Sequence, residues 1–208
     1  LCWQRFVDRH DSLMASCRRG DEVVWEREIS DGGEVLHPVI LAHGGAIWYA
    51  WSEYARENWR ILARCYRDGQ WGGVLTVASG EALFFPRLFT WQGKLHVIWT
   101  EQHKGSAAAV LCPLTETGPG AAETVSAVGE AYRAGAAEGG DGNLYVAYDG
   151  FDGKQYKLFA RARTAAGWSE EIVVSQGEDW ASTPWIAAKP DGAVVGWYDY
   201  GYMAVYSV

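Results

Sequence analysis

The stretch Ile47-Trp48-Tyr49-Ala50-Trp51, an apolar run closed by an aromatic residue, recurs three more times along the chain. The other copies are Leu95–Trp99, Leu144–Tyr148 and Val194–Trp197, so the closing aromatic residues are 48, 49 and 49 positions apart. A glycine turn, such as Asp141-Gly142, precedes each copy by a few residues. Glycine accepts the positive φ of tight hairpin turns. Each copy therefore predicts the second strand of a β-hairpin.

Other residues, three prolines and four serines, recur with the same period. Three prolines open a short apolar segment 13 residues before a closing aromatic residue, namely Pro38, Pro86 and Pro184. Four serines that end the units are 49, 47 and 49 residues apart: Ser30, Ser79, Ser126 and Ser175. A period near 48 residues with four short strands per unit is typical of a β-propeller. We therefore expect an all-β fold of four-stranded antiparallel blades, with strands near 38–41, 46–51, 60–65 and 73–78 in one unit.

The repeat divides a single domain, residues 1–208, into blades. Three are complete (31–79, 80–126 and 127–175), and two are partial (1–30 and 176–208). Joining the partial units would close a ring of five blades. The alternative is a fragment of a six- or seven-bladed propeller. The third strand expected in both partial units (13–17 and 202–206) supports that alternative, and the sequence leaves both arrangements open.

Composition limits the classes of partner. The net charge of −8 and the pI near 5.1 argue against a protein that tracks the nucleic-acid backbone. No apolar run approaches about 20 residues, so no membrane-spanning helix is expected. Cys17, Cys65 and Cys112 stand at equivalent positions of successive units and are predicted to be free, buried thiols. No Cys-x-x-Cys pair is present, which argues against a zinc site.

A turn motif carries a family resemblance. The expected turn between third and fourth strands reads Arg67-Asp68-Gly69-Gln70-Trp71, with related turns at 166–169 and 20–25. It resembles the Asp-box of sialidase-type (BNR-repeat) propellers, although the leading Ser or Thr of that box is absent. The resemblance implies structural roles for Asp68 and Trp71, and it implies a carbohydrate-related protein, either a glycoside hydrolase or a glycan-binding module. The Arg-Ile-Pro motif of sialidases is also absent from the sequence.

Candidate site residues follow from strand position. In a propeller, the loops after second strands and before first strands gather at one mouth of the channel. The acids after the closing aromatic residues are candidates for catalysis (Glu53, Glu101 and Asp199). The neighbouring candidates for ligand binding are Arg87, Arg133, Tyr132, Asp149, Trp185 and His37. Paired carboxylates beside aromatic rings suit a sugar site, because one acid protonates the leaving group while the other acts as base or nucleophile.

Two other functions compete with this hypothesis. One is a non-catalytic scaffold that binds protein loops, and the other is an incomplete enzyme that further blades or a partner chain complete. No cofactor is expected. A Ca²⁺ ion is the single alternative, because clustered carboxylate oxygens suit it, although no EF-hand-like loop is present. The expected partner is a glycan or small sugar, with a protein partner as the alternative and neither nucleic acid nor a membrane span.

Overall fold

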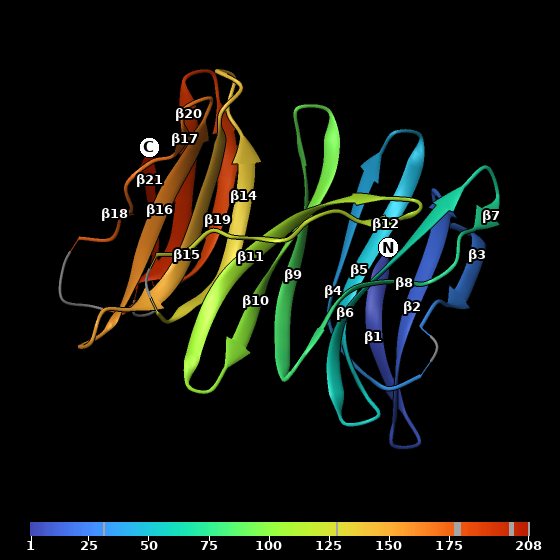
Figure 1. Ribbon diagram of the computed structural model, residues 1–208. Coiled ribbons are helices and arrows are strands. Elements are labelled where there is room, and N and C mark those ends of the chain that lie inside the picture. The colour runs from blue at the N-terminus through green and yellow to red at the C-terminus, as the bar shows by residue number, and fades with distance from the viewer. Residues whose placement is uncertain (31, 128, 177–179, 200–201, 208) are drawn as a thin grey trace.

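The structure is a computed structural model of residues 1–208, in which residues 31, 128, 177–179, 200–201 and 208 are not described (Figure 1). Every element in the described ranges is a β-strand, and the pairings within the sheets are antiparallel. The strands form five sheets in chain order. The all-β expectation is therefore confirmed, and the arrangement is that of β-propeller blades.

Each sheet is a meander, and its strands are as follows. Sheet 1 contains β1 (Cys2–Val7), β2 (His10–Arg19) and β3 (Glu22–Glu28). Sheet 2 contains β4 (Glu34–His43), β5 (Ala46–Ala55), β6 (Asn58–Arg67), β7 (Gln70–Trp71) and β8 (Leu75–Gly80). Sheet 3 contains β9 (Ala82–Trp91), β10 (Lys94–His103), β11 (Ser106–Thr115), β12 (Gly118–Pro119) and β13 (Glu123–Thr124). Sheet 4 contains β14 (Ala131–Glu138), β15 (Leu144–Phe151), β16 (Tyr156–Thr164), β17 (Gly167–Trp168) and β18 (Ile172–Val173). Sheet 5 contains β19 (Ala181–Lys189), β20 (Gly192–Asp199) and β21 (Tyr202–Ser207).

The outer edge of each complete sheet is made of two short strands. In sheet 2, β7 and β8 both pair with β6, and sheets 3 and 4 repeat this arrangement with β12 and β13, and with β17 and β18. The expected fourth strand is thus broken into two pieces. Of the four strands predicted for sheet 2, the first three lie within β4, β5 and β6, and the fourth overlaps β8. The strands β4, β5 and β6 are several residues longer than the apolar pattern indicates.

The core lies between successive sheets. Trp51 packs between sheets 1 and 2, Trp99 between sheets 2 and 3, Tyr148 between sheets 3 and 4, and Trp197 between sheets 4 and 5. The four closing aromatic residues are at most 5% exposed. Because side chains alternate across a strand, each sheet contributes apolar residues to the layers on both of its faces. The repeated aromatic residue is therefore a packing residue.

Repeated polar contacts fasten the units. Three of the four repeated serines accept a hydrogen bond from the backbone N–H seventeen residues earlier in the chain: Ser30 from Leu13, Ser126 from Ala109 and Ser175 from Leu158. Arg64 donates to the carbonyl oxygen of Ile29 in the connection that follows sheet 1, and Arg161 donates to Val125 in the connection that follows sheet 3. These arginines also lie over Trp71 and Trp168.

The ring closure expected from joining the two partial units is not confirmed. Each partial unit forms a three-stranded sheet of its own, and among the described residues no strand of sheet 1 pairs with a strand of sheet 5. The two sheets lie at opposite sides of the row (Figure 1). The reason is that each already contains a third strand, β2 and β21. The position of Cys17 also differs from the prediction: Cys65 and Cys112 are free and buried, but free Cys17 in sheet 1 is only half-buried.

Candidate functional site

Four β-bulges mark the same position of successive sheets. His37, Phe85, Arg133 and Thr183 have φ of 54°, 56°, 43° and 56°, in the left-handed region that non-glycine residues rarely adopt. The strand register shifts at each of them. They lie on the first strands β4, β9, β14 and β19, which contact one another in succession: β4 with β9, β9 with β14, and β14 with β19. Bulges of this kind are over-represented beside functional sites, where they re-aim a side chain.

The bulges lie near one end of the sheets, which we call the bulge end. It is the end at which the first strand of sheets 2–5 begins and the second strand finishes. The pairings Glu34 with Tyr54 and Ala82 with Gln102 show this for sheets 2 and 3. The second-strand residues that follow the closing aromatic residues therefore lie beside the bulges, as the propeller topology requires.

Side chains of the preceding sheet hold two of the bulges. The backbone N–H of Arg133 donates to Thr100 Oγ1 at 3.1 Å. Asp149 accepts a hydrogen bond from the backbone of Thr183. Thr100 and Asp149 occupy the same position of their sheets, one residue after Trp99 and Tyr148, and both are fully buried. Sequence reasoning missed Thr100, although its place directly after the repeated aromatic residue was a usable signal.

Asp149 forms a buried ion pair with Arg133. Arg133 Nε donates to Asp149 Oδ1 at 3.1 Å, and Arg133 Nη2 donates to the other carboxylate oxygen. Burial raises the pKa of Asp149, and the hydrogen bonds and charge of Arg133 oppose that rise. The guanidinium is about one-third exposed while the carboxylate is fully covered. The carboxylate thus fixes the position of an arginine that solvent or a ligand reaches.

Glu53 is also buried, but on the opposite face. Its carboxylate accepts a hydrogen bond from Trp51 Nε1 at 3.2 Å and pairs with Arg60. Glu53 stands two residues after its closing aromatic residue and Asp149 only one after, so their side chains point to opposite faces of their sheets. The four predicted acids therefore do not form one equivalent set. Sequence reasoning also missed Arg60, which only the pairing of β5 with β6 brings opposite Glu53.

The other two predicted acids have different surroundings. Glu101 is exposed near the end of β10. Asp199 is half-buried at the end of β20, and its Oδ1 is covered without a hydrogen-bond partner in the described part of the chain. Of the four acids, Glu53 and Asp149 are fully buried and engaged by arginines, so direct contact with a substrate is left to Glu101 and Asp199.

Aromatic side chains surround the bulges. The ring of His37 packs against the ring of Phe85, with centroids 4.1 Å apart. Phe84, which precedes Phe85 on β9, has its ring centroid 4.6 Å from that of Trp59 on β6. A second group at the bulge end contains Tyr132, Tyr156 and Trp180 with centroid distances of 6.1 and 5.4 Å. Trp185 lies edge-on to Tyr198 at 4.9 Å, and both are exposed. Such rings offer apolar faces near polar groups.

Arg87 is the exposed cation of the innermost strands. It stands two residues after the Phe85 bulge. Burial, together with the charge of Arg87, lowers the pKa of His37, so this imidazole is neutral at pH 7. Burial raises the pKa of Tyr132, which keeps its hydroxyl protonated. The bulge end therefore presents a cation, a neutral imidazole and a phenol beside aromatic rings.

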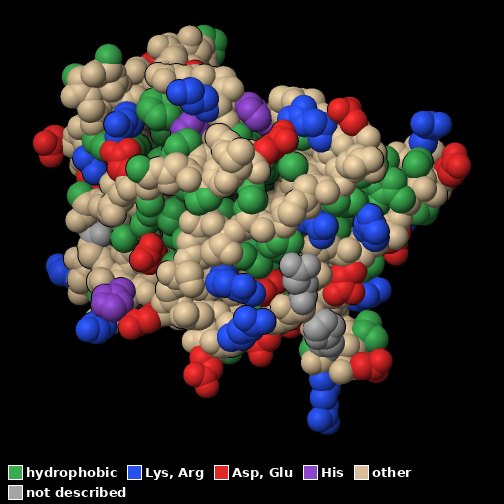
Figure 2. All heavy atoms as spheres, turned by 45° about the vertical axis from the view of Figure 1, so that its right-hand side comes forward, with side chains coloured by type: hydrophobic (Ala, Val, Ile, Leu, Met, Phe, Trp, Pro, Cys, Tyr) green, Lys and Arg blue, Asp and Glu red, His purple; other side chains and the backbone are tan. Residues whose placement is uncertain are grey.

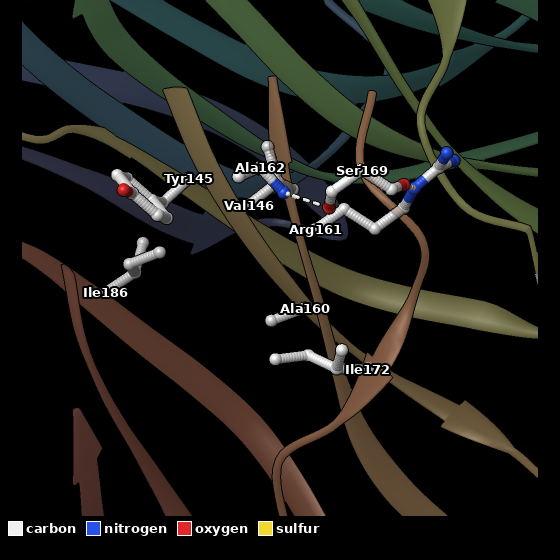
Figure 3. A pocket seen from close by; sticks show the side chains of 8 residues that line it. All are labelled: Tyr145, Val146, Ala160, Arg161, Ala162, Ser169, Ile172 and Ile186. Carbon is white, nitrogen blue, oxygen red and sulfur yellow. Dashed lines mark hydrogen bonds between the residues drawn. The ribbon is translucent and has the colours of Figure 1, made fainter. Parts of the chain in front are cut away.

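An apolar cavity of about 200 Å³ lies elsewhere, between sheets 4 and 5 (Figure 3). Val146, Ala160 and Ile172 of sheet 4 line it, together with Ile186 of sheet 5. Arg161 at its border donates to the carbonyl oxygens of Ser169 and Val125. The cavity is a gap in the packing between two sheets, and its lining offers little polar chemistry.

Neither the distribution of surface charge nor a cluster of metal-ligating side chains marks another site in the described part of the chain. Figure 2 shows acidic and basic side chains interspersed over one face of the molecule, with hydrophobic side chains exposed between them. In the described ranges, His, Cys, Asp and Glu do not form a group of three or more that could hold a metal ion. These residues also form no helix that is long and apolar enough to cross a membrane.

Comparisons with known proteins show the fold. No protein-family model and no curated protein matches the chain. A protein of unknown function from Dyadobacter fermentans superimposes with a TM-score of 0.66 at 14% identity, over 83% of this chain and 65% of its own length. An ulvan lyase of polysaccharide lyase family PL25 matches with a TM-score of 0.63 at 9% identity, covering 96% of this chain and 61% of the lyase. An endo-arabinase from Bacteroides thetaiotaomicron matches with a TM-score of 0.58 at 9% identity, covering 100% and 93%. At identities this low, the TM-scores show a shared β-propeller architecture and the fold alone.

Proposed function

We propose that the protein binds a carbohydrate at the bulge end of its sheets. The observation that carries the proposal is the row of four strained bulges, at His37, Phe85, Arg133 and Thr183, which lie at equivalent positions near one end of the innermost strands. Strain of about 1–3 kcal/mol per residue persists only where the surroundings impose it, and it is concentrated at binding sites. At two of the four bulges, Arg133 and Thr183, buried side chains of the preceding sheet hold the backbone in place, Thr100 and Asp149.

The chemistry of the bulge end suits a sugar. Arg87 and the exposed part of Arg133 donate hydrogen bonds to hydroxyl or carboxylate oxygens, and His37 and Tyr132 add neutral polar groups. Trp185 and Tyr132 offer apolar ring faces that a pyranose or furanose can cover. Among proteins of this architecture are an endo-arabinase and an ulvan lyase, which supports a carbohydrate-related role by analogy of fold.

Binding is better supported than hydrolysis. Asp149 and Glu53 are fully buried and held by arginines, so Asp149 acts as a positioning residue for Arg133. A glycoside hydrolase of the common two-carboxylate type would need two accessible carboxylates flanking the scissile bond. Glu101 and Asp199 are the candidates for that role, and the hydrolytic form of the proposal rests on them.

The test uses three probes: arabino-oligosaccharides, ulvan oligosaccharides and sialyllactose. Isothermal titration should detect binding of at least one of them, and Arg87→Ala should weaken it about tenfold or more because a hydrogen bond to a charged group is lost. Arg67→Ala is the matched control, because Arg67 lies at the other end of sheet 2 and pairs with Glu116. Equal affinity of the two variants would place the sugar elsewhere. Release of reducing ends that Glu101→Gln abolishes would establish hydrolysis.

The scaffold function is favoured by a different observation. Phe6 and Val7 on β1 are 67% and 52% exposed, and Ile172 and Val173 on β18 are 48% and 56% exposed. Exposed apolar side chains in pairs suit a protein partner. A scaffold would bind none of the three sugars, and its partner affinity would fall in Phe6→Ser while Arg87→Ala left it unchanged.

A further inference from the structure

A hollow of about 290 Å³ lies on sheet 3, away from the innermost strands. Glu101 of β10 borders it, together with Ala108 and Val110 of β11 and Glu123 and Thr124 of β13. It lies on the side of the second, third and fourth strands, whereas the proposed sugar site lies on the first strands. The hollow therefore differs from the proposed sugar-binding surface, and it shares with that proposal only Glu101, on which the hydrolytic form rests.

Sheet 2 fills the equivalent place with an arginine. Glu53 of β5 stands opposite Arg60 of β6 in the strand register, and the two side chains form an ion pair. Trp51, two residues earlier on the same face, donates its indole N–H to the second oxygen of Glu53. Indole, carboxylate and guanidinium thus form a closed triad, in which Glu53 is fully buried.

Sheet 3 keeps two members of this triad and lacks the third. Trp99 and Glu101 repeat Trp51 and Glu53, but the residue opposite Glu101 is Ala108. The side chain that would fill the hollow is missing. Trp99 is 1% exposed, and its indole nitrogen has no hydrogen-bond partner within the described part of the chain. Glu101 is exposed and makes no ion pair with any described residue.

The neighbouring charges leave Glu101 uncompensated. Glu123 on the other side of the hollow is already engaged, because its Oε1 accepts from Arg163 and from Trp168 Nε1. His103 Nδ1 lies 3.0 Å from Glu81 Oε2, so His103 is paired with Glu81 rather than with Glu101. The hollow therefore combines a carboxylate without an ion-pair partner among the described residues and the space of an absent arginine side chain. Behind it, two residues before Glu101 on the same face of β10, lies the buried indole N–H of Trp99.

We propose that this hollow binds a guanidinium group. A bound guanidinium would take the place that Arg60 occupies in sheet 2 and would draw the Glu101 carboxylate inward. The carboxylate would then accept from both the ligand and Trp99 Nε1, which restores the triad. A planar guanidinium matches a carboxylate better than a compact ammonium does, because it donates two parallel hydrogen bonds. The group comes either from a small molecule or from an arginine side chain of a peptide.

The experiment follows the indole N–H resonance of Trp99 in ¹⁵N-labelled protein, assigned with Trp99→Phe. Agmatine represents the small-molecule source and N-acetyl-arginine N-methylamide the peptide source. We expect a saturable shift of this resonance with at least one probe, and the preferred probe identifies the source. Glu101→Gln should weaken binding roughly ten- to a hundredfold, since a charge-assisted hydrogen bond is lost. Glu116→Gln, the same change at the other end of sheet 3, should leave affinity unchanged.

Ala108→Arg supplies the missing side chain from within the chain. It should move the Trp99 indole resonance without ligand and abolish the response to both probes. An unmoved resonance at saturating concentrations of both probes would overturn the proposal, as would equal affinities of the Glu101→Gln and Glu116→Gln variants. Because neither result depends on sugar binding by Arg87, failure here leaves the proposed carbohydrate site untouched.

Discussion

Replacing Arg133 with alanine would leave the Asp149 carboxylate buried without the guanidinium that compensates its charge. Asp149 is fully covered, and Arg133 engages both of its oxygens. Removing one partner of such a pair costs about 3–5 kcal/mol, because the remaining charge stays desolvated. For a domain of this size that cost corresponds to a fall in Tm of about 6–20 °C. Thermal and urea unfolding followed by tryptophan fluorescence would measure it.

The same variant should show a distinctive pH dependence. A carboxyl whose folded pKa is raised stabilises the fold when protonated, and that stability is lost as pH rises through the folded pKa. Burial raises the pKa of Asp149, and Arg133 opposes the rise. Arg133→Ala should therefore raise this pKa further, and the stability gap to the wild type should narrow toward about pH 4, near the unfolded pKa of an aspartate.

Two controls make the reasoning refutable. Arg67→Ala removes an ion pair whose side chains are 38% and 50% exposed, and it should cost about 1 kcal/mol or less. The double variant Arg133→Ala/Asp149→Asn should be more stable than Arg133→Ala, because no buried charge remains. A loss below about 1 kcal/mol in Arg133→Ala, or a loss that is the same at pH 4 and pH 7, would refute the account.

Three further predictions concern the packing between sheets. Thiol counting with Ellman's reagent should find Cys65 and Cys112 protected in the native protein, since both are buried and burial raises the pKa of Cys112 to about 11; rapid native labelling of either would contradict this. Burial raises the pKa of Tyr49 to about 12, so its phenol should stay protonated at pH 11 in the folded protein; ultraviolet absorbance at that pH should show its ionisation only when the protein unfolds. Arg64→Ala should lower the free energy of unfolding by about 1–3 kcal/mol in chemical denaturation, because the hydrogen bond from Arg64 to the carbonyl oxygen of Ile29, 3.1 Å long, links sheet 2 to the connection that follows sheet 1. Arg161→Ala, the matching change in sheet 4, should lower it by a similar amount.

Local signals in the sequence determined the architecture. Glycine turns and short apolar runs decide where a strand begins and ends, since they act within a few residues of the chain. Their recurrence every 48 or 49 residues then implied equivalent sheets, and the buried positions of Trp51, Trp99 and Trp197 follow from that equivalence. The existence of the repeat, the all-β class and the core aromatic residues were therefore predictable.

The partners of the polar residues were decided only by tertiary structure. Glu53 and Glu101 look alike in the repeat, yet one faces Arg60 and the other Ala108 across a strand pair. Which residue stands opposite is set by register, and a shift of one position reverses the face. The bulges at Arg133 and Thr183 likewise depend on side chains of the preceding sheet, Thr100 and Asp149. Strand register within the hairpins and contacts between neighbouring sheets, rather than the repeat itself, thus gave similar units different chemical surroundings.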